Sequence, residues 1–270
     1  MLSWIRVGFV AVLFSFVALL VSPLQAQNSE QLEVGPPPLH RVDPPAPGAS
    51  PEELEERGDE LRAEKIFLDA IDYYEAALKG SPASASLFNK IGMCQLQLHR
   101  DKEAKKSFER SIKADRNHAD SYNNLGATYY DMHNNSAAIK QYEKAISLKG
   151  DAAAYYSNLG TAYFGKKQFE QAIRCYAKAV GLDPDVFDRN SHGGLQARLA
   201  SPEDRAHYDY VLAKMYAGAG VNDRSLHYLK KAMEEGYNIK NVYKDNEFST
   251  LRKDPRFAEL MAAKTLAISD

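Results

Sequence analysis

One stretch of the sequence decides the fold, and it reads Tyr156-Ser157-Asn158-Leu159-Gly160-Thr161-Ala162-Tyr163, followed by Ala172, Tyr176, Ala179 and Pro184. Its glycine is the last of four that follow one another at intervals of 34 residues, the others being Gly58, Gly92 and Gly126. We number each unit so that this glycine is position 8. A fixed period of this length, held at several positions, predicts a solenoid of repeated units.

Small and apolar residues recur at the other positions of the unit. Positions 4, 7, 8 and 11 form the apolar stripe of one helix, and positions 20, 24 and 27 form that of a second. Position 20 is always alanine, whereas position 24 is aromatic, and these residues are Ala70, Ala104, Ala138, Ala172 and Tyr74, Phe108, Tyr142, Tyr176. Glycine at 8 and alanine at 20 predict close approach of the two helix backbones, with aromatic side chains beside that contact.

This pattern resembles the tetratricopeptide repeat, strongly over residues 51–186 and weakly over residues 206–236. The resemblance implies an all-α fold, a right-handed α-α superhelix whose concave surface binds a protein partner. We place four regular repeats at 51–84, 85–118, 119–152 and 153–186. The first departs most from the pattern, and since terminal repeats are often atypical we interpret it as an N-terminal cap.

The pattern breaks after Val186. Residues 187–205 are predicted to form an insertion loop, which contains the segment from Asn190 to Gly194. A helix start at Ser201-Pro202 then opens a divergent fifth repeat over 206–236 with a lengthened first helix. Residues 237–270 are predicted to form a C-terminal cap with one amphipathic helix, which covers the exposed end of that repeat.

The N-terminal segment has the composition of an export signal. Arg6 precedes an apolar run from Val7 to Val21, and we predict a signal peptide over residues 1–26, cleaved after Ala26. The alternative is an uncleaved signal anchor, which would hold the chain at a membrane and facing the periplasm. Residues 27–50 are polar and then proline-rich, which predicts a semi-rigid linker. We therefore expect an exported protein, periplasmic or secreted.

Several chemistries find no support in the sequence. The 34 Lys and Arg residues nearly balance the 36 Asp and Glu residues, and no basic face for nucleic acid is evident. The histidines show no spacing of metal ligands. The segment from Gly160 to Lys167 nearly matches a phosphate-binding loop but falls inside a predicted helix. Cys94 and Cys175 lie two repeats apart, too far for a disulfide. We expect no enzyme activity, no metal and no cofactor.

The resemblance also implies where a partner would bind, because the first helices of such repeats line the concave groove. Carried onto this chain, the protein-binding residues are Asn89, Lys90, Met93, Asn123, Asn124, Tyr130, Asn158, Phe164 and Lys214. Asparagine amides both donate and accept hydrogen bonds, as recognition of an extended peptide requires. Tyr130 and Phe164 would offer apolar pockets nearby.

Two functions remain open on the sequence. The first is a non-enzymatic scaffold or adaptor in the cell envelope, which binds a partner segment in the groove. The alternative is an accessory subunit or an enzyme that acts on envelope polymers through the 187–205 insertion. The lack of a catalytic constellation favours the scaffold.

Overall fold

The computed structural model describes residues 42–189 and 201–267, and these contain helices but no strand. The predicted all-α repeat array is therefore confirmed. The described residues belong to one compact unit. The predicted signal peptide, most of the linker and the loop from Asn190 to Gly194 lie outside the described residues.

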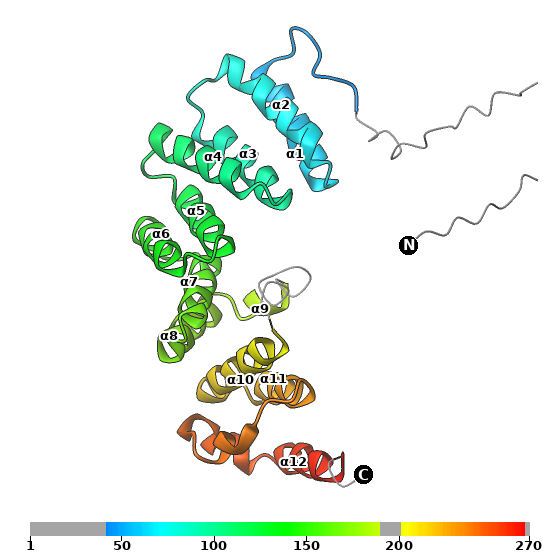
Figure 1. The fold of residues 1–270 in the computed structure, drawn as a ribbon, viewed down its shortest axis with the longest axis vertical. Helices are drawn as coiled ribbons and strands as arrows, with labels where there is room; N and C mark the ends of the chain where they lie inside the picture. Colours follow the sequence, from blue (N-terminus) through cyan, green and yellow to red (C-terminus); the bar gives the residue numbers. More distant parts are fainter. Residues whose placement is uncertain (1–41, 190–200, 268–270) are drawn as a thin grey trace, which may run out of the picture. The chain divides into compact units, whose positions relative to one another are not determined.

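The helices follow one another in antiparallel pairs (Figure 1). The pairs are α1 (Pro51–Ala63) with α2 (Phe67–Gly80), α3 (Ala85–Gln97) with α4 (Asp101–Ala114), α5 (Ala119–Asp131) with α6 (Asn135–Leu148), α7 (Ala153–Gly165) with α8 (Phe169–Leu182), and α10 (Pro202–Gly218) with α11 (Asn222–Glu234).

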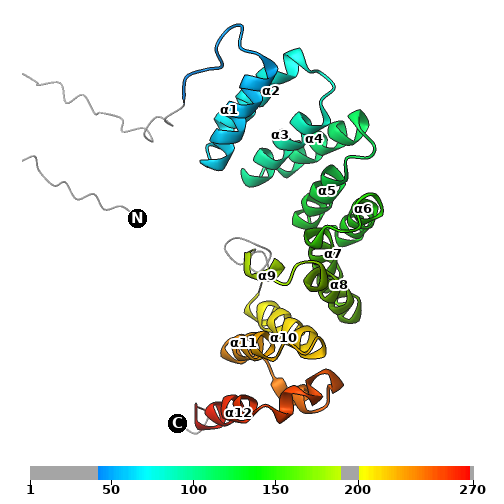
Figure 2. The ribbon, with the colours of Figure 1, turned by 180° about the vertical axis from the view of Figure 1, so that it is seen from behind.

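Each pair stacks on the next through its second helix. α2 packs on α3, α4 on α5, α6 on α7 and α8 on α10, and Figure 2 shows the same sequence of pairs from behind. The short helix α9 (Val186–Arg189) contacts α7 and α8. Because each unit touches mainly its neighbours, the apolar face that one pair cannot bury alone is covered by the adjoining pair.

A ring resting on a glycine holds each regular pair together. A Cβ added at Gly126 would lie 2.7 Å from the ring of Tyr142, closer than real side chains approach. The other three position-8 glycines meet the position-24 ring of their own repeat in the same way, at 2.5 to 2.6 Å. The glycine therefore makes room for the aromatic side chain, rather than only for the opposite backbone as the sequence suggested.

The fifth pair replaces both members of this contact. Ala213 stands at position 8 and Leu229 at position 24, and both are fully buried. Leucine is smaller than the aromatic residue of the regular repeats, so it leaves room for a methyl group at position 8. Two coupled changes thus preserve the packing, which explains why this repeat lacks the signature and still forms a helix pair.

The turn between paired helices has the same backbone form in each of the four regular repeats. His133 has φ 59°, and the equivalent Lys65, His99 and Lys167 have φ between 56° and 64°. The next residue, Asn134, donates its amide to the carbonyl of Tyr129, which closes the helix with a left-handed cap. His99 and His133 are therefore part of these helix caps.

The end of the predicted linker is part of the folded unit. Val42 and Ala49 pack against the core of the first repeat, and the hydroxyl of Tyr73 on α2 donates to the carbonyl of Asp43 at 3.0 Å. Ser50 then caps α1 and exchanges two hydrogen bonds with Glu53, which begins the first helix. Residues 42–50 thus anchor the chain on α2 instead of acting as a spacer.

The C-terminal part contains more helices than the single amphipathic helix predicted from the sequence. Three short 3₁₀ helices precede α12 (Pro255–Ala267), and these are η3 (Ile239–Tyr243), η4 (Asn246–Ser249) and η5 (Leu251–Lys253). Their side chains Val242, Phe248 and Leu251 are fully buried in the same core as α10 and α11. The 3₁₀ helices therefore carry out much of the covering that the sequence assigned to the last helix.

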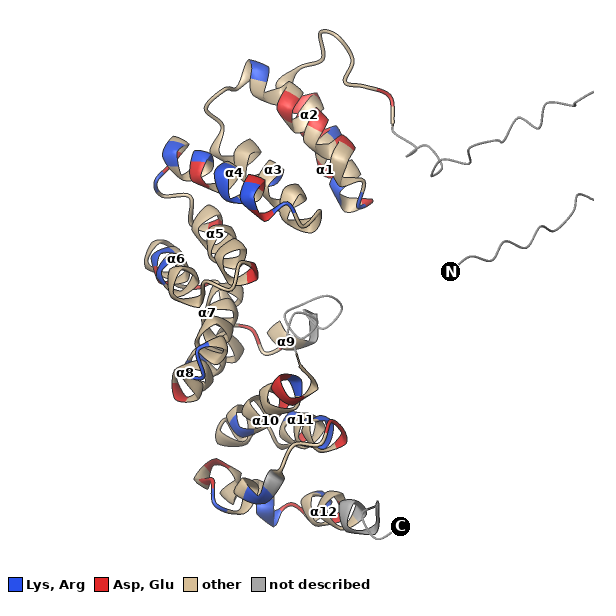
Figure 3. Cartoon of the chain, in the orientation of Figure 1, with Lys and Arg blue, Asp and Glu red and all other residues tan. Residues whose placement is uncertain are grey.

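The second helices carry a basic row that the balanced composition conceals. Figure 3 shows Lys and Arg gathered on α4, and basic residues recur at positions 22 and 26 of repeats two to four. The position-26 cations lie over the position-4 rings of their own repeat, at 4.1 Å for Arg110 over Phe88 and 5.9 Å for Lys144 over Tyr122. Part of this charge therefore covers aromatic rings.

Candidate protein-binding site

Polar side chains connect each first helix to the first helix of the next repeat. The two residues of each contact are 35 positions apart in the sequence, one more than the repeat length of 34 residues. Each contact therefore joins position 5 of one unit to position 6 of the following unit. The pairs are Glu55 with Lys90, Asn89 with Asn124, and Asn123 with Asn158. Equal offsets place the three contacts along one face of the array.

Four asparagines form a continuous chain of hydrogen bonds across α3, α5 and α7. Asn158 donates to Asn123 at 3.0 Å, Asn123 donates to Asn124 at 3.2 Å, and Asn124 donates to Asn89 at 3.0 Å. We call this chain the amide ladder. Asn123, Asn124 and Asn158 are half-buried, whereas Asn89 is buried. Asn124 and Asn158 are joined through Asn123.

Buried hydroxyl groups fix the N-terminal end of the ladder. The Oδ1 atom of Asn89 also accepts from Ser121 at 3.2 Å, and Ser121 shares a hydrogen bond with Ser111 at 2.6 Å. Ser111 replaces the alanine that other repeats have at position 27, and its hydroxyl donates to the carbonyl of Ala85. These bonds satisfy polar groups that would otherwise be costly to bury.

Lys90 is engaged within the protein. Its Nζ atom lies 2.6 Å from a carboxylate oxygen of Glu55 and 2.6 Å from one of Asp59. Burial lowers the pKa of the Lys90 ammonium, but the two carboxylates outweigh this effect, so its pKa lies above the ordinary value. The acidic first helix is thus neutralised in part by the next repeat. Met93, half-buried, lies beside the Asn89 amide.

Lys214 likewise joins parts of the fold. Its Nζ atom lies 3.5 to 3.7 Å from carboxylate oxygens of Glu170, Asp245 and Glu247. Burial lowers the pKa of this ammonium, yet the three carboxylates raise it above its ordinary value overall. Lys214 therefore ties α10 to α8 and to the 3₁₀ segment, a role that the sequence did not indicate.

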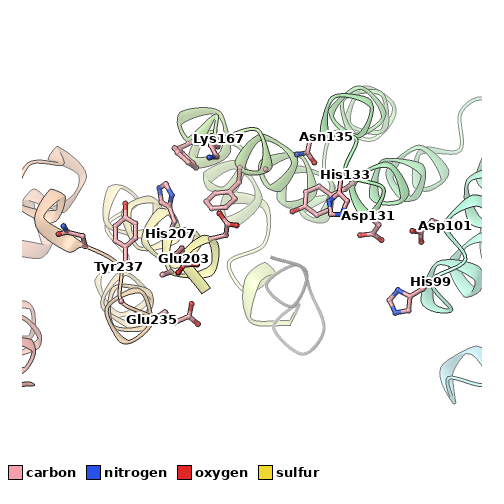
Figure 4. A pocket seen from close by; sticks show the side chains of 18 residues that line it. His99, Asp101, Asp131, His133, Asn135, Lys167, Glu203, His207, Glu235 and Tyr237 are labelled. Carbon is pink, nitrogen blue, oxygen red and sulfur yellow. The ribbon is translucent and has the colours of Figure 1, made fainter. Parts of the chain in front are cut away.

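A hollow in the described part of the chain lies where the helix pairs turn, and we call it the turn pocket. Its volume is about 840 Å³. It is bordered by the ends of α5 and α7, the start of α10 and the loop after α11 (Figure 4). The lining residues are His99, Asp101, Tyr130, Asp131, His133, Asn135, Phe164, Gly165, Lys167, Phe169, Glu203, Asp204, Ala206, His207, Glu235, Gly236, Tyr237 and Asn238.

Two of the predicted groove residues line this pocket. Tyr130 is half-buried, and Phe164 is only 4% exposed. The ring of Phe164 meets those of His207 and Tyr208, with centroids 5.6 Å and 5.5 Å away. Repeat five therefore covers most of Phe164. The ring of Phe164 therefore forms part of the packed lining of the pocket and exposes little surface to a partner.

A column of rings forms one wall of the turn pocket. The His207 imidazole lies 4.2 Å from the ring of Phe169 and stacks on Tyr237 at 5.2 Å. Tyr237 in turn stacks on Tyr210 at 4.5 Å. Burial lowers the pKa of His207, an effect that Asp204 opposes and Lys167 reinforces. No sequence pattern indicated this wall, because its members come from three separate elements.

The remaining candidate chemistries concern a metal ion, the cysteine thiols and the apparent phosphate loop. No three His, Cys, Asp or Glu side chains of that part converge to hold a metal ion. Cys94 and Cys175 are free thiols, and burial raises the pKa of each to about 11. Gly160, the first residue of the apparent phosphate loop, lies inside α7 against Tyr176. Within residues 42–189 and 201–267, no helix is apolar over a length that spans a bilayer.

The repeats can now be assigned to a family. A tetratricopeptide repeat family model matches residues 119–151 and 153–186, and a second one matches residues 85–118. The chain is therefore a tetratricopeptide repeat protein, a class whose repeats bind protein and peptide partners. No curated protein matches its sequence at a significant level.

Solved structures share this architecture at low sequence identity. PilF of Pseudomonas aeruginosa is 17% identical, with a TM-score of 0.53 over 81% of this chain and 90% of its own. TTC0263, a thermophilic tetratricopeptide repeat protein of Thermus thermophilus, is 18% identical, with a TM-score of 0.49 over 78% and 99%. MamA of Desulfovibrio magneticus RS-1 is 19% identical, with a TM-score of 0.49 over 68% and 94%. The likeness to PilF is one of fold.

Proposed function

We propose that this protein is a non-enzymatic scaffold that binds an extended segment of a protein partner along the amide ladder, with the turn pocket at one end of the bound segment. The observation that supports this proposal is that α5 and α7 each carry a ladder asparagine and, six residues further along the helix, a residue that lines the pocket. These pairs are Asn124 with Tyr130 and Asn158 with Phe164. Six helical residues span about 9 Å, so one segment can reach both.

The ladder retains the means to bind a backbone. Each amide group carries two N–H donors, and the ladder uses one donor of Asn123, Asn124 and Asn158. The same three side chains are half-buried and reachable from outside. Lys90, committed to ion pairs with Glu55 and Asp59, would instead hold the first two repeats in register beside the ladder. Lys214 would hold α10 on α8 and on the 3₁₀ segment.

Capture of the partner by ladder variants tests the proposal. Asn124→Ala with Asn158→Ala should reduce recovery of the partner at least fivefold, because the backbone of the partner segment loses its contacts with these two side-chain amides. These side chains are bonded to each other, so we expect a stability loss of about 0.5–1.5 kcal/mol per hydrogen bond removed.

The matched control is Gln141→Ala with Gln171→Ala, two half-buried amides on the second helices α6 and α8. Recovery should be unchanged in this variant. Equal recovery by both double variants at matched thermal stability would mean that the ladder is not the binding surface.

We further propose that the scaffold works outside the cytoplasm, in the cell envelope. Support comes from Arg6 and the apolar run from Val7 to Val21. N-terminal sequencing of the fractionated protein is the test. A start near Gln27 in the soluble envelope fraction supports export, intact chain in the membrane supports the anchor, and intact chain in the cytosol rejects both.

A further inference from the structure

The turn pocket is strongly acidic. Among the described residues that line it, five carry carboxylates and Lys167 alone carries a permanent positive charge. The carboxylates belong to Asp101, Asp131, Glu203, Asp204 and Glu235. Such a surface attracts a cation and repels an anion.

The acidic groups nearest the ring wall come from two elements. Figure 4 shows Glu203 and Glu235 at the same end of the pocket as His207 and Tyr237. Glu203 is exposed in the first turn of α10, and Glu235 lies 3.8 Å from Arg205. That distance is long for an ion pair, and a solvent-exposed pair of this kind contributes little.

The wall beside these carboxylates suits the side chain of an arginine. The rings of His207 and Tyr237 are both partly exposed and both line the pocket. Their faces already meet each other and the rings of Phe169 and Tyr210, so the wall offers apolar contact to the carbon stem of an arginine rather than an open face to its guanidinium. The planar array of donors of a guanidinium matches the two oxygens of a carboxylate.

We propose that the turn pocket receives an arginine side chain of the partner segment, whose carbon stem lies against the His207–Tyr237 wall and whose guanidinium pairs with Glu203 and Glu235. This inference rests on the proposed function and specifies its partner as a basic segment. The amide ladder would hold the backbone of that segment, and the pocket would select its side chain.

The test uses the full chain and two short fluorescein-labelled peptides, one alternating arginine with leucine and one with citrulline in place of arginine. Citrulline keeps the shape of arginine and removes its charge. Fluorescence anisotropy should show about tenfold tighter binding of the arginine peptide, from the contacts of its guanidinium with the carboxylates.

Glu203→Gln with Glu235→Gln should remove this preference, and the control Glu52→Gln with Glu75→Gln, which changes net charge equally on α1 and α2, should keep it. Equal binding of both peptides, no binding of the arginine peptide, or equal losses in the two variants would overturn the arginine site. The ladder variant separates the proposals: if it alone weakens both peptides equally, the scaffold function stands without the arginine site.

Discussion

At the residue scale, the contact between position 8 and position 24 defines the helix pair. The ring of Tyr142 covers Gly126 so closely that a Cβ would lie 2.7 Å from it. We expect Gly126→Ala to cost about 1–3 kcal/mol, because the buried ring must move within a packed core. The urea midpoint of unfolding measures this loss.

The fifth repeat supplies the control for this prediction. Ala213 and Leu229 occupy the same two positions there, so Gly126→Ala with Tyr142→Leu should be more stable than the sum of the single changes predicts. Strict additivity of the two single variants would contradict the proposed contact.

At the element scale, the 3₁₀ segment after α11 closes the array. Phe248 of η4 is fully buried and lies 5.6 Å from the ring of Tyr210 on α10. Phe248→Ala should cost about 3–5 kcal/mol, the usual loss for a buried aromatic side chain. Thermal unfolding followed by circular dichroism gives the measurement, and exposed Tyr243→Ala serves as the control.

The ring wall between α10, α8 and the loop after α11 should make stability depend on pH. His207 has a pKa below its ordinary 6.5, mainly because it is buried, so the unfolded chain takes up a proton at a pH where the folded chain does not. The stability of the protein is then unaffected by His207 above the ordinary pKa of 6.5, and it falls as the pH drops below that pKa.

The effect of His207 appears in a comparison of melting temperatures at about pH 7.5 and about pH 5.5. The unaltered protein should lose more than His207→Phe, which keeps a ring in the column without a titrating group. Parallel losses in both proteins would assign the pH dependence to the carboxylates instead.

The sequence predicted the regular helix pairs because their signature residues repeat and make contacts within one unit. Gly126 and Tyr142 meet inside a single repeat, so a pattern of fixed period reveals them. It missed η3 to η5, since these short helices have no periodicity of their own and exist because Val242, Phe248 and Leu251 are buried against α10 and α11.

The candidate site was only partly accessible to the same reasoning. The asparagines could be placed on the first helices, but their pairing at an offset of 35 residues depends on how neighbouring repeats are turned against each other. The acidic pocket was missed because Glu203, His207 and Tyr237 belong to the irregular fifth repeat and its following loop. The order of these residues along the chain does not indicate that they lie together in the fold.

At the scale of the whole molecule, buried apolar side chains are distributed unevenly along the array. In the described residues, the largest core joins repeats four and five to the C-terminal segment. The core between α4 and α5 has only three buried apolar side chains, Ala104, Phe108 and Leu125, and its other apolar members are partly exposed. In a stacked array, local stability follows the interfaces of each unit.

Hydrogen exchange should therefore report the slowest amides in α10 and α11 and faster opening in α4 and α5. Mass spectrometry of peptic fragments resolves these regions. Uniform exchange along the array, as in a single cooperative transition, would contradict this view.

The amide ladder would also set the lifetime of a partner segment bound along it. Asn89, Asn123, Asn124 and Asn158 already bond to one another, so an arriving backbone that displaces a ladder bond exchanges one hydrogen bond for another. The net gain from each exchange is small. Complexes held by such exchange dissociate readily, and a scaffold of this kind can pass one partner on and receive the next without a separate release step.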